Sequence, residues 1–333
     1  MKPNVMPGNA AFYTQTTKNR MLDMLESSLG PDIWKSLDDP LVTEVRVNSD
    51  GSIWLDKIGS GDVRLDTTMT PDKAYSVLMI VADAKGEQIG DENPSFDAVI
   101  PGYGYRFAGT LPPLTAAPAF NIRKKPGRVI TLDEYVASGI MTERQKAALI
   151  EAVKNRETVL VGGGTGSGKT TLLNAVLQVM AATGDRILTV EDTLELMNSA
   201  RDQESFLTVP GVRTMEDCLR IALRFHPKRL VFGEARGAEV RAMMMAMNSG
   251  HPGGALTLHS DSNRDSLYRI EEMLETIPNY QPRPKTIARV MRCLVYISTT
   301  HDRVRYPAGR YVSEIAKVHG WTSEEGYQLE VVG

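Results

Sequence analysis

A glycine-rich segment restricts the chemistry of this chain more tightly than any other stretch. Residues Gly163 to Thr170 read G-G-T-G-S-G-K-T, which matches the phosphate-binding pattern G-x-x-x-x-G-K-[ST]. Glycines let successive backbone N–H groups face phosphate oxygens, and the start of the following helix adds a favourable dipole. We expect Lys169 to contact the β- and γ-phosphates of ATP, and Thr170 to hold Mg²⁺ through its hydroxyl. The residues expected to bind the nucleotide here are Gly163, Gly164, Thr165, Gly166, Ser167, Gly168, Lys169, Thr170 and Thr171.

A short apolar run, R-L-V-F-G-E, ends in the carboxylate of Glu234. In a parallel sheet, ligands bind beyond the carboxyl ends of the strands. A phosphate-binding loop accounts for nucleotide binding only, and hydrolysis also needs a group that orients the attacking water. We expect Glu234 to be this base. The alternative is that Glu234 only opens the next helix, where acids are favoured.

A second apolar run, I-L-T-V-E-D, ends at Glu191 and Asp192, with Glu195 shortly after. This acidic box has two interpretations. Glu191 and Asp192 could assist the base or hold Mg²⁺ through water, and we expect Glu191 to be catalytic and Asp192 to be the metal ligand. Alternatively, these acids form a solvated loop.

Two histidines, His251 and His259, flank a glycine-rich turn and a strand-like run in S-G-H-P-G-G-A-L-T-L-H-S. We expect His259, at the end of that run, to contact a γ-phosphate or to report its loss. The spacing of the two histidines does not indicate a metal pair, and no cysteine lies nearby, so zinc is not expected. The preceding methionines, Met243 to Met247, are predicted to be helix core.

The composition is that of a soluble globular protein, with 42% hydrophobic and 24% charged residues. At 333 residues, two domains are expected, and a net charge of −3 gives no general attraction to nucleic acid or anionic lipid. The two cysteines, Cys218 and Cys293, indicate neither a disulfide framework nor a zinc site. The N-terminus lacks a signal core and no apolar stretch could span a bilayer, so we expect a cytosolic chain or one docked on a membrane through partners.

The order of predicted elements divides the chain at a basic segment near Arg123. Residues 1–122 are expected to form an α+β domain, with a hairpin from Val42 to Leu55 and a helix from Asp72 to Ala84. Residues 123–140 are the predicted linker, which includes a helix near 132–138. Residues 141–333 follow as the second domain, which opens with a helix from Thr142 to Asn155.

In the second domain, strand-like runs alternate with helical patterns. The predicted strands are Thr158 to Val161, Ile187 to Val190, Leu230 to Phe232 and Ala255 to Leu258. Such alternation favours right-handed crossovers and a mostly parallel sheet with helices on both faces, which is an α/β fold. Alternation around Pro307 to Gly309 predicts a terminal hairpin over residues 304–318.

Together these motifs resemble the secretion ATPase superfamily of type II and type IV secretion, pilus and conjugation systems, and most of all its conjugal-transfer branch. Similar blocks extend from about Glu44 to Ile315. They include R-F-A-G-T-L-P-P, N-I-R-K-K, the phosphate-binding loop, T-V-E-D-T-L-E-L, G-E-A-R-G, the histidine box and G-R-Y-V-S-E-I. Four ordered nucleotide motifs make this resemblance specific.

The resemblance implies a homohexameric motor that hydrolyses ATP with Mg²⁺ and acts with other type IV secretion proteins of mating-pair formation. It also implies that residues 141–333 form a RecA-like P-loop ATPase domain, and that the protein has a cytoplasmic position peripheral to the inner membrane. By the same resemblance, Arg106 and Arg123 match N-terminal-domain arginines that reach the triphosphate, as planar guanidinium groups suit phosphate oxygens. The alternative for Arg123 is a basic surface patch.

One position departs from the family pattern P-D-R, because this chain reads Pro227-Lys228-Arg229. The contact that the aspartate makes in relatives is therefore in doubt here. Nearby arginines are candidates for contacts with a neighbouring subunit; they are Arg224, Arg229 and Arg236.

Three other functions remain open from the sequence. A type II secretion or pilus motor is the nearest, although many type II motors carry a tetracysteine zinc insertion that this chain lacks. A nucleic-acid translocase or helicase shares the core fold. Only Arg123 to Arg128 is strongly basic, however, so the sequence contains no strong sign of direct nucleic-acid binding. A nucleotide-gated scaffold without turnover is disfavoured by Glu191 and Glu234.

Overall fold

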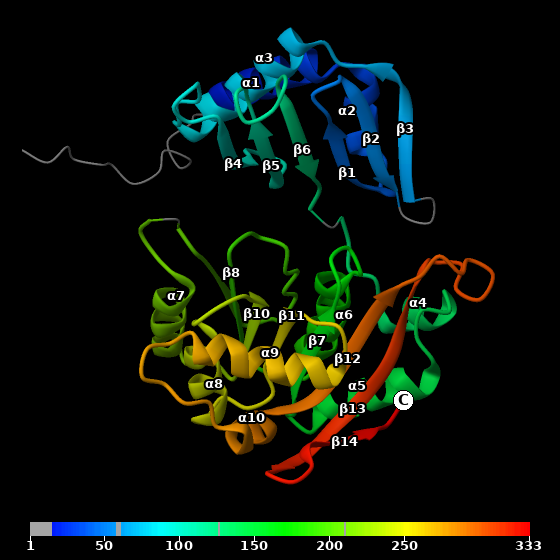
Figure 1. Ribbon diagram of the computed structural model, residues 1–333, viewed down its shortest axis with the longest axis vertical. Coiled ribbons are helices and arrows are strands. Elements are labelled where there is room, and N and C mark those ends of the chain that lie inside the picture. Colours follow the sequence, from blue (N-terminus) through cyan, green and yellow to red (C-terminus); the bar gives the residue numbers. More distant parts are fainter. Residues whose placement is uncertain (1–14, 58–60, 126, 210) are drawn as a thin grey trace, which may run out of the picture. The chain divides into compact units, whose positions relative to one another are not determined.

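The computed structural model describes residues 15–57, 61–125, 127–209 and 211–333. The chain divides into two compact units, Met1–Gly127 and Arg128–Gly333 (Figure 1). The expected linker, 123–140, is split in this division, because its residues from 128 onward belong to the second unit and include helix α4 (Leu132–Ala137).

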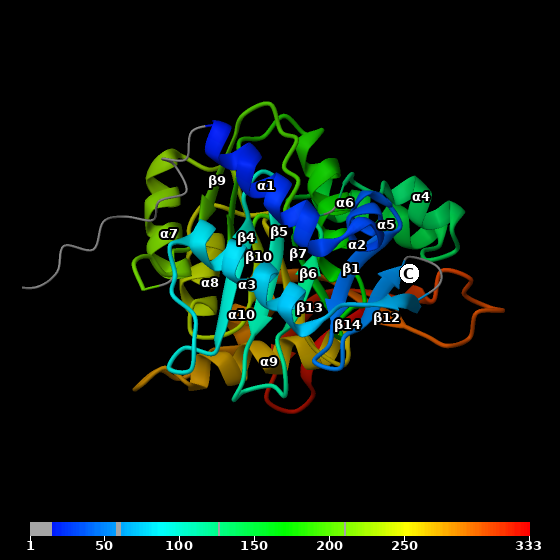
Figure 2. The same ribbon diagram turned by 90° about the horizontal axis from the view of Figure 1, so that it is seen from above.

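The first unit is an antiparallel sheet with the strand order β3-β2-β1-β6-β5-β4. Helices α1 and α3 pack side by side in this unit (Figure 2). Helix α3 begins at Pro71 because the Thr70 hydroxyl accepts from the Lys73 N–H, and it ends before Gly86 in the left-handed conformation. The predicted hairpin and helix are thereby confirmed. The elements of this unit are α1 (Gln15–Leu29), α2 (Pro31–Asp38), β1 (Val42–Val47), β2 (Ser52–Lys57), β3 (Gly61–Thr68), α3 (Pro71–Lys85), β4 (Ser95–Ile100), β5 (Tyr105–Thr110) and β6 (Ala119–Arg123).

The second unit contains an eight-stranded sheet in the order β14-β13-β12-β7-β11-β10-β8-β9. Strands β12 through β9 in this order are parallel, and β13 and β14 are antiparallel additions. The predicted mostly parallel α/β fold is confirmed. The strands are β7 (Thr158–Gly163), β8 (Ile187–Glu191), β9 (Gln203–Leu207), β10 (Arg229–Ala235), β11 (Ala255–His259), β12 (Met291–Thr299), β13 (Arg310–Thr322) and β14 (Gly326–Val331).

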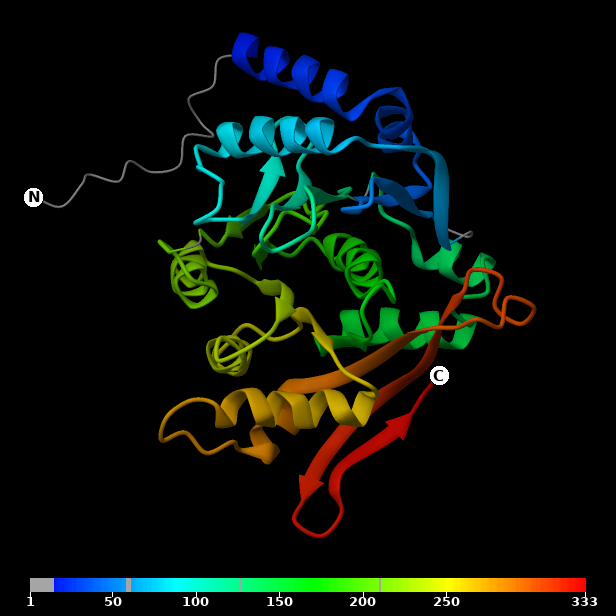
Figure 3. The ribbon, with the colours of Figure 1, turned by 45° about the horizontal axis from the view of Figure 1, so that its top comes forward.

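Helices cover both faces of this sheet, because successive strand residues point to opposite sides. Leu160 packs with helices on one face, whereas Val159 and Val161 pack on the other. Figure 3 shows helices of the two faces apart from one another, with α5 and α6 in green and α9 in yellow. The helices are α5 (Glu143–Lys154) and α6 (Lys169–Ala181) with α4 on one face, and α7 (Met215–Ala222), α8 (Val240–Asn248), α9 (Asn263–Glu275) and α10 (Pro284–Val290) on the other.

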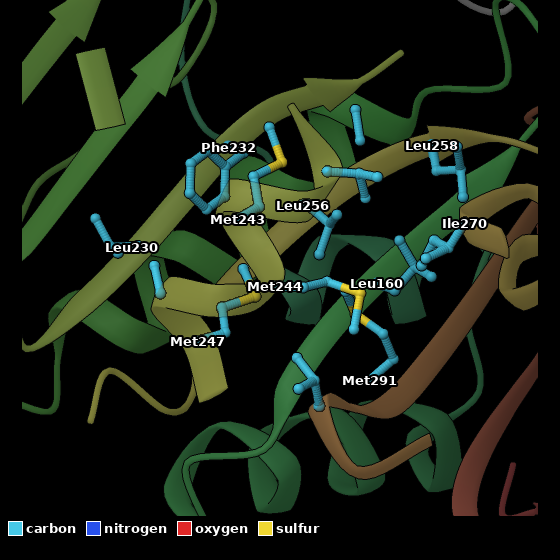
Figure 4. Close-up of a cluster of buried hydrophobic side chains, with 14 of the residues drawn as sticks. Leu160, Leu230, Phe232, Met243, Met244, Met247, Leu256, Leu258, Ile270 and Met291 are labelled. Atoms are coloured by element: carbon cyan, nitrogen blue, oxygen red, sulfur yellow. The ribbon is translucent and has the colours of Figure 1, made fainter. Parts of the chain in front are cut away.

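The methionine-rich segment belongs to this hydrophobic core. Met243, Met244 and Met247 of α8 are buried against strand residues such as Phe232 and Leu256 (Figure 4). Met245 points away and is 59% exposed. The prediction that these methionines form helix core is confirmed for the three buried ones.

The predicted terminal hairpin over residues 304–318 is wrong. Strand β13 starts only at Arg310 and pairs with β12 on one side and β14 on the other. Residues 300–309 form the connection between β12 and β13 instead, with Gly309 donating to the Tyr306 carbonyl. The alternating residues from Arg310 onward do form a strand, but the strands that pair with it, β12 and β14, lie outside residues 304–318.

Candidate nucleotide-binding site

The phosphate-binding loop connects the buried strand β7 to helix α6, as predicted. Helix α6 starts at Lys169 after Gly168, whose φ is +98°, and no side chain caps its N-terminus. Helices α5 and α7, by contrast, begin with a threonine that caps the first turn. The first N–H groups of α6 are therefore left for another acceptor, and an anion suits them.

Two residues of the loop, Gly163 and Ser167, are closely constrained by their surroundings. A side chain at Gly163 would meet the Ile297 carbonyl at 2.4 Å, so only glycine fits there. Ser167 is 1% exposed, and its Oγ has no hydrogen-bond partner among the described residues. A buried hydroxyl without a partner is unfavourable, and a ligand oxygen would satisfy it.

Lys169 is buried and its ammonium group connects the loop to strand β11. Its Nζ donates to the Gly164 carbonyl at 2.9 Å and lies 3.3 Å from Nδ1 and 3.4 Å from Nε2 of His259. The lysine and histidine that the sequence singled out are thus neighbours in the structure.

His259 also contacts Glu234, since its Nε2 lies 2.8 Å from Oε1 of that carboxylate. Partial burial and the positive charge of Lys169 lower the pKa of His259, and Glu234 opposes this shift. A neutral imidazole fits the arrangement, because Nε2 can donate to Glu234 while Nδ1 accepts from Lys169. A continuous chain of contacts therefore joins Glu234, His259 and Lys169 at the carboxyl edge of the sheet.

Glu234 has a second partner that sequence reasoning did not assign. Its Oε2 accepts a hydrogen bond from Nε of Arg236, whose Nη1 lies 3.9 Å from Oδ2 of Asp192. The order G-E-A-R could have suggested this pair, because the side chains at positions 234 and 236 point to the same side of extended backbone.

The two members of the acidic box have different surroundings. Glu191 is 1% exposed, and its Oε2 accepts the N–H groups of Glu195 and Leu196, both at 2.9 Å. Asp192 is exposed and accepts from the Thr208 hydroxyl at 2.9 Å. Glu191 thus anchors the loop after β8, while Asp192 lines a groove of about 410 Å³ with Thr208 and Thr214.

Arg310 is a residue of this site that the sequence did not single out. A side chain at Gly168 would meet Nη1 of Arg310 at 2.8 Å, so the guanidinium lies against the start of α6. No carboxylate pairs with Arg310 among the residues that the structure describes. A cation beside the positive end of a helix is unfavourable unless an anion binds there. Arg310 belongs to the G-R-Y-V-S-E-I block noted in the sequence, but the sequence alone did not assign this arginine a role.

Arg106 and Arg123 lie in the first unit, directly opposite each other on the antiparallel strands β5 and β6. Arg123 is exposed and Arg106 is half-buried. The structure therefore brings these two predicted arginines together at one position of their sheet.

The remaining candidates lie elsewhere. Nδ1 of His251 is 3.2 Å from the Ala246 carbonyl, so this histidine packs at the end of α8. Arg229 is buried and hydrogen bonded within its own unit, which overturns the expectation that it could face a neighbouring subunit. Arg224 and Lys228 are exposed. Both cysteines are buried and unbridged, and no cluster of three metal-binding side chains occurs among the described residues.

The comparisons with known proteins agree with this geometry. Residues 90–295 match the family described as type II/IV secretion system protein. The chain belongs to this family. "Conjugal transfer protein TrbB" of Rhizobium radiobacter is 36% identical over 313 residues, which cover 93% of this chain and 94% of the relative. The predicted resemblance to the conjugal-transfer branch is confirmed by this similarity to TrbB.

Two further similarities support the family and the fold. "Type IV secretion system protein VirB11" of Brucella suis is 27% identical over 347 residues, which cover 93% of each chain. The crystal structure of the pilus retraction motor PilT with bound ADP matches at a TM-score of 0.61 and 18% identity, and the match covers 91% of this chain and 82% of that one. As a member of this family of secretion ATPases, the chain is an ATPase, as predicted. Among the described residues, no helix is both long and apolar enough to cross a bilayer.

Proposed function

We propose that this chain is a homohexameric motor that hydrolyses ATP with Mg²⁺ and powers conjugative type IV secretion, including pilus assembly and the transfer of DNA or protein. It acts on the cytoplasmic side, peripheral to the inner membrane, with the mating-pair formation proteins of its system. The names of its relatives support this assignment, since they are a conjugal transfer protein and a type IV secretion protein.

ATP binds through its phosphates in the loop from Gly163 to Thr171. The uncapped N–H groups of α6, the Ser167 hydroxyl and the Lys169 ammonium supply donors for phosphate oxygens. Arg310 adds a positive charge at the same helix start. By the family resemblance, Arg106 and Arg123, which lie directly opposite each other on β5 and β6, are two further guanidinium groups proposed for the triphosphate.

The residues present suit Mg²⁺. Thr170 stands in the first turn of α6, and Asp192 presents an exposed carboxylate, so both offer the hard oxygen ligands that this ion prefers. Thr170 would hold the ion directly and Asp192 through water. When bound, Mg²⁺ neutralises charge on the β- and γ-phosphates during transfer.

Glu234 is the base that orients and deprotonates the attacking water, and Glu191 supports it by holding the loop after β8. The observation that carries this proposal is the chain of contacts from Glu234 through His259 to Lys169. A bound phosphate that draws Lys169 away from His259 would change the contacts of His259, which is a partner of Glu234. His259 therefore reports the presence of the γ-phosphate to the base.

The test measures the ATPase rate and native mass of the wild type, Lys169→Ala and Glu234→Gln, with and without Mg²⁺ and single-stranded DNA. The matched controls, Lys228→Ala and Glu275→Gln, alter exposed side chains. We expect a hexamer whose Mg²⁺-dependent turnover responds little to DNA. Turnover should fall at least ~100-fold in both site variants, as for other lost catalytic groups, while Glu234→Gln keeps its ATP affinity.

Two results would contradict the proposal. A monomer strongly activated by DNA would indicate a nucleic-acid translocase instead of a secretion motor. Loss of ATP binding in Glu234→Gln would remove this residue from the role of base.

A further inference from the structure

Both carboxylate oxygens of Glu234 are occupied by other side chains. Oε1 lies 2.8 Å from Nε2 of His259, and Oε2 accepts the Nε–H of Arg236. The side chain of Glu234 is only 16% exposed, so water has little other access to it. One of the two acceptor sites of each oxygen is therefore engaged, and because the carboxylate is largely enclosed, the remaining sites leave little room for a water molecule that gives up a proton.

The backbone that carries Arg236 is itself held in place. The N–H groups of Arg236 and Gly237 donate to Oε1 of Glu239 at 2.7 Å and 2.8 Å. This carboxylate at the start of α8 fixes the short connection after β10. The position of the guanidinium therefore depends on rotation of the Arg236 side chain more than on movement of the loop.

A second acceptor lies within reach of the same guanidinium. Nη1 of Arg236 is 3.9 Å from Oδ2 of Asp192, which is an ion-pair distance but longer than a hydrogen bond. Oδ1 of Asp192 accepts from the Thr208 hydroxyl at 2.9 Å, which leaves Oδ2 facing the arginine. Arg236 thus stands between two carboxylates, bonded to one and close to the other.

We propose that Arg236 is a positioning residue that holds Glu234 in a resting arrangement, and that Glu234 becomes available to water when Arg236 moves from Glu234 to Asp192. The inference rests on the proposed function, because it takes Glu234 as the base. In the resting arrangement the arginine engages Oε2. In the active arrangement Oε2 accepts the proton of the attacking water, and the arginine is paired with Asp192.

Exchange between these two carboxylates needs no large structural change. Arg236 is 57% exposed, so its side chain can rotate without disturbing the core. The positive charge stays beside a negative partner throughout, which keeps the energetic difference between the two arrangements small. A difference of this size is one that nucleotide or a neighbouring subunit can reverse.

The experiment compares Arg236→Gln, Arg236→Lys, Asp192→Asn and the double variant Arg236→Gln/Asp192→Asn, with Arg224→Gln as an exposed control. The kcat and KM for ATP are measured on the full chain, with native mass as a folding check. Loss of the resting contact should raise kcat about threefold to tenfold in Arg236→Gln, with KM within about twofold. Asp192→Asn removes the alternative partner and should lower kcat.

The double variant separates this exchange from a role of Asp192 at the metal. Rates are measured at saturating Mg²⁺, which compensates a weakened water-mediated contact of Asp192 with the ion. Under this condition the double variant should be as fast as Arg236→Gln if Arg236 acts through Asp192. If it is as slow as Asp192→Asn, Asp192 acts on its own and the exchange is refuted. Arg236→Lys keeps the positive charge but lacks the several N–H donors with which a guanidinium can contact both carboxylates, so its kcat should lie between those of wild type and Arg236→Gln. If Arg236→Gln does not fold, Arg236→Lys provides the test.

Other results overturn the inference in distinct ways. Turnover in Arg236→Gln as low as in Glu234→Gln would make the arginine part of the active arrangement. An unchanged kcat in Arg236→Gln, with Glu234→Gln inactive, would refute only the resting contact. Full turnover in Glu234→Gln would refute the base itself, and the proposed function with it.

Discussion

Strand β10 begins with Arg229 and is followed directly by Arg236, and the two arginines are held in opposite ways. The side chain of Arg229 is 1% exposed and that of Arg236 is 57% exposed. Arg229 is hydrogen bonded to Asp185 at 2.7 Å, to the Gly253 carbonyl at 2.9 Å and to the Val153 carbonyl at 3.0 Å. Arg236 has one bonded and one distant carboxylate. The buried, fully bonded arginine stabilises the fold, and the exposed one is free to exchange partners.

The surroundings of Asp185 show what the buried arginine stabilises. Burial opposes the charge on Asp185, but hydrogen bonds from Arg229 and Thr183 and the nearby Arg156 hold the pKa of this carboxyl below its ordinary value. A buried charge that loses its partner is strongly destabilising. The amino end of the sheet therefore depends on Arg229 for stability, whereas the carboxyl end, with Arg236, holds the proposed catalytic site.

The largest expected effect comes from Arg229→Met, which leaves Asp185 without its buried partner. We expect this variant to lose about 3–5 kcal/mol of unfolding free energy, and Arg236→Met to lose less than about 1 kcal/mol. Urea unfolding can be followed by the fluorescence of Trp321, after Trp34 and Trp54 have been replaced by phenylalanine. Equal losses in the two variants would remove the distinction between the two ends of the strand.

A smaller effect is expected from pH at the carboxyl end. Because the pKa of His259 is lowered in the folded chain, the unfolded chain binds this proton first as the pH falls. His259 should therefore make stability decline as the pH drops below about 6.5, the ordinary histidine value, until the folded-state pKa is passed. His259→Gln should remove this part of the pH dependence, while His301→Gln, an exposed control, should retain it. Unfolding curves between pH 7 and pH 5 test this, and identical slopes in all three chains would contradict it.

The smallest effect is expected at Lys228, the position where the family pattern P-D-R has aspartate. Its side chain is exposed, whereas the neighbouring Arg229 already has its full set of partners inside the unit. Lys228→Asp should change the unfolding free energy by less than about 0.5 kcal/mol and leave kcat unchanged. A loss comparable to that of Arg229→Met would show that the charge at position 228 acts on the buried arginine.

Local sequence patterns predicted the parts of the fold that depend on near neighbours. The hairpin around Gly51, the helix between Pro71 and Gly86 and the strand before the phosphate-binding loop all occur where turn, helix-boundary and β-branched residues indicated them. Helices α1 and α2 and the outer strand β9 were not predicted. The residues 304–318 were assigned to a hairpin of their own because alternation indicates a strand but not its partner.

The sequence by itself determined that this chain has a phosphate-binding loop, and that Glu234 and His259 lie at the carboxyl ends of strands, because these features depend on residues adjacent in the chain. Only the tertiary structure decided which side chains meet. Lys169 and His259 are 90 positions apart and come together because β7 and β11 are neighbouring parallel strands. Burial in the same fold separates Arg229 from Arg236, and strand β13 brings Arg310 to Gly168. Residue type cannot distinguish these arginines, because exposure and partners arise only when distant segments pack.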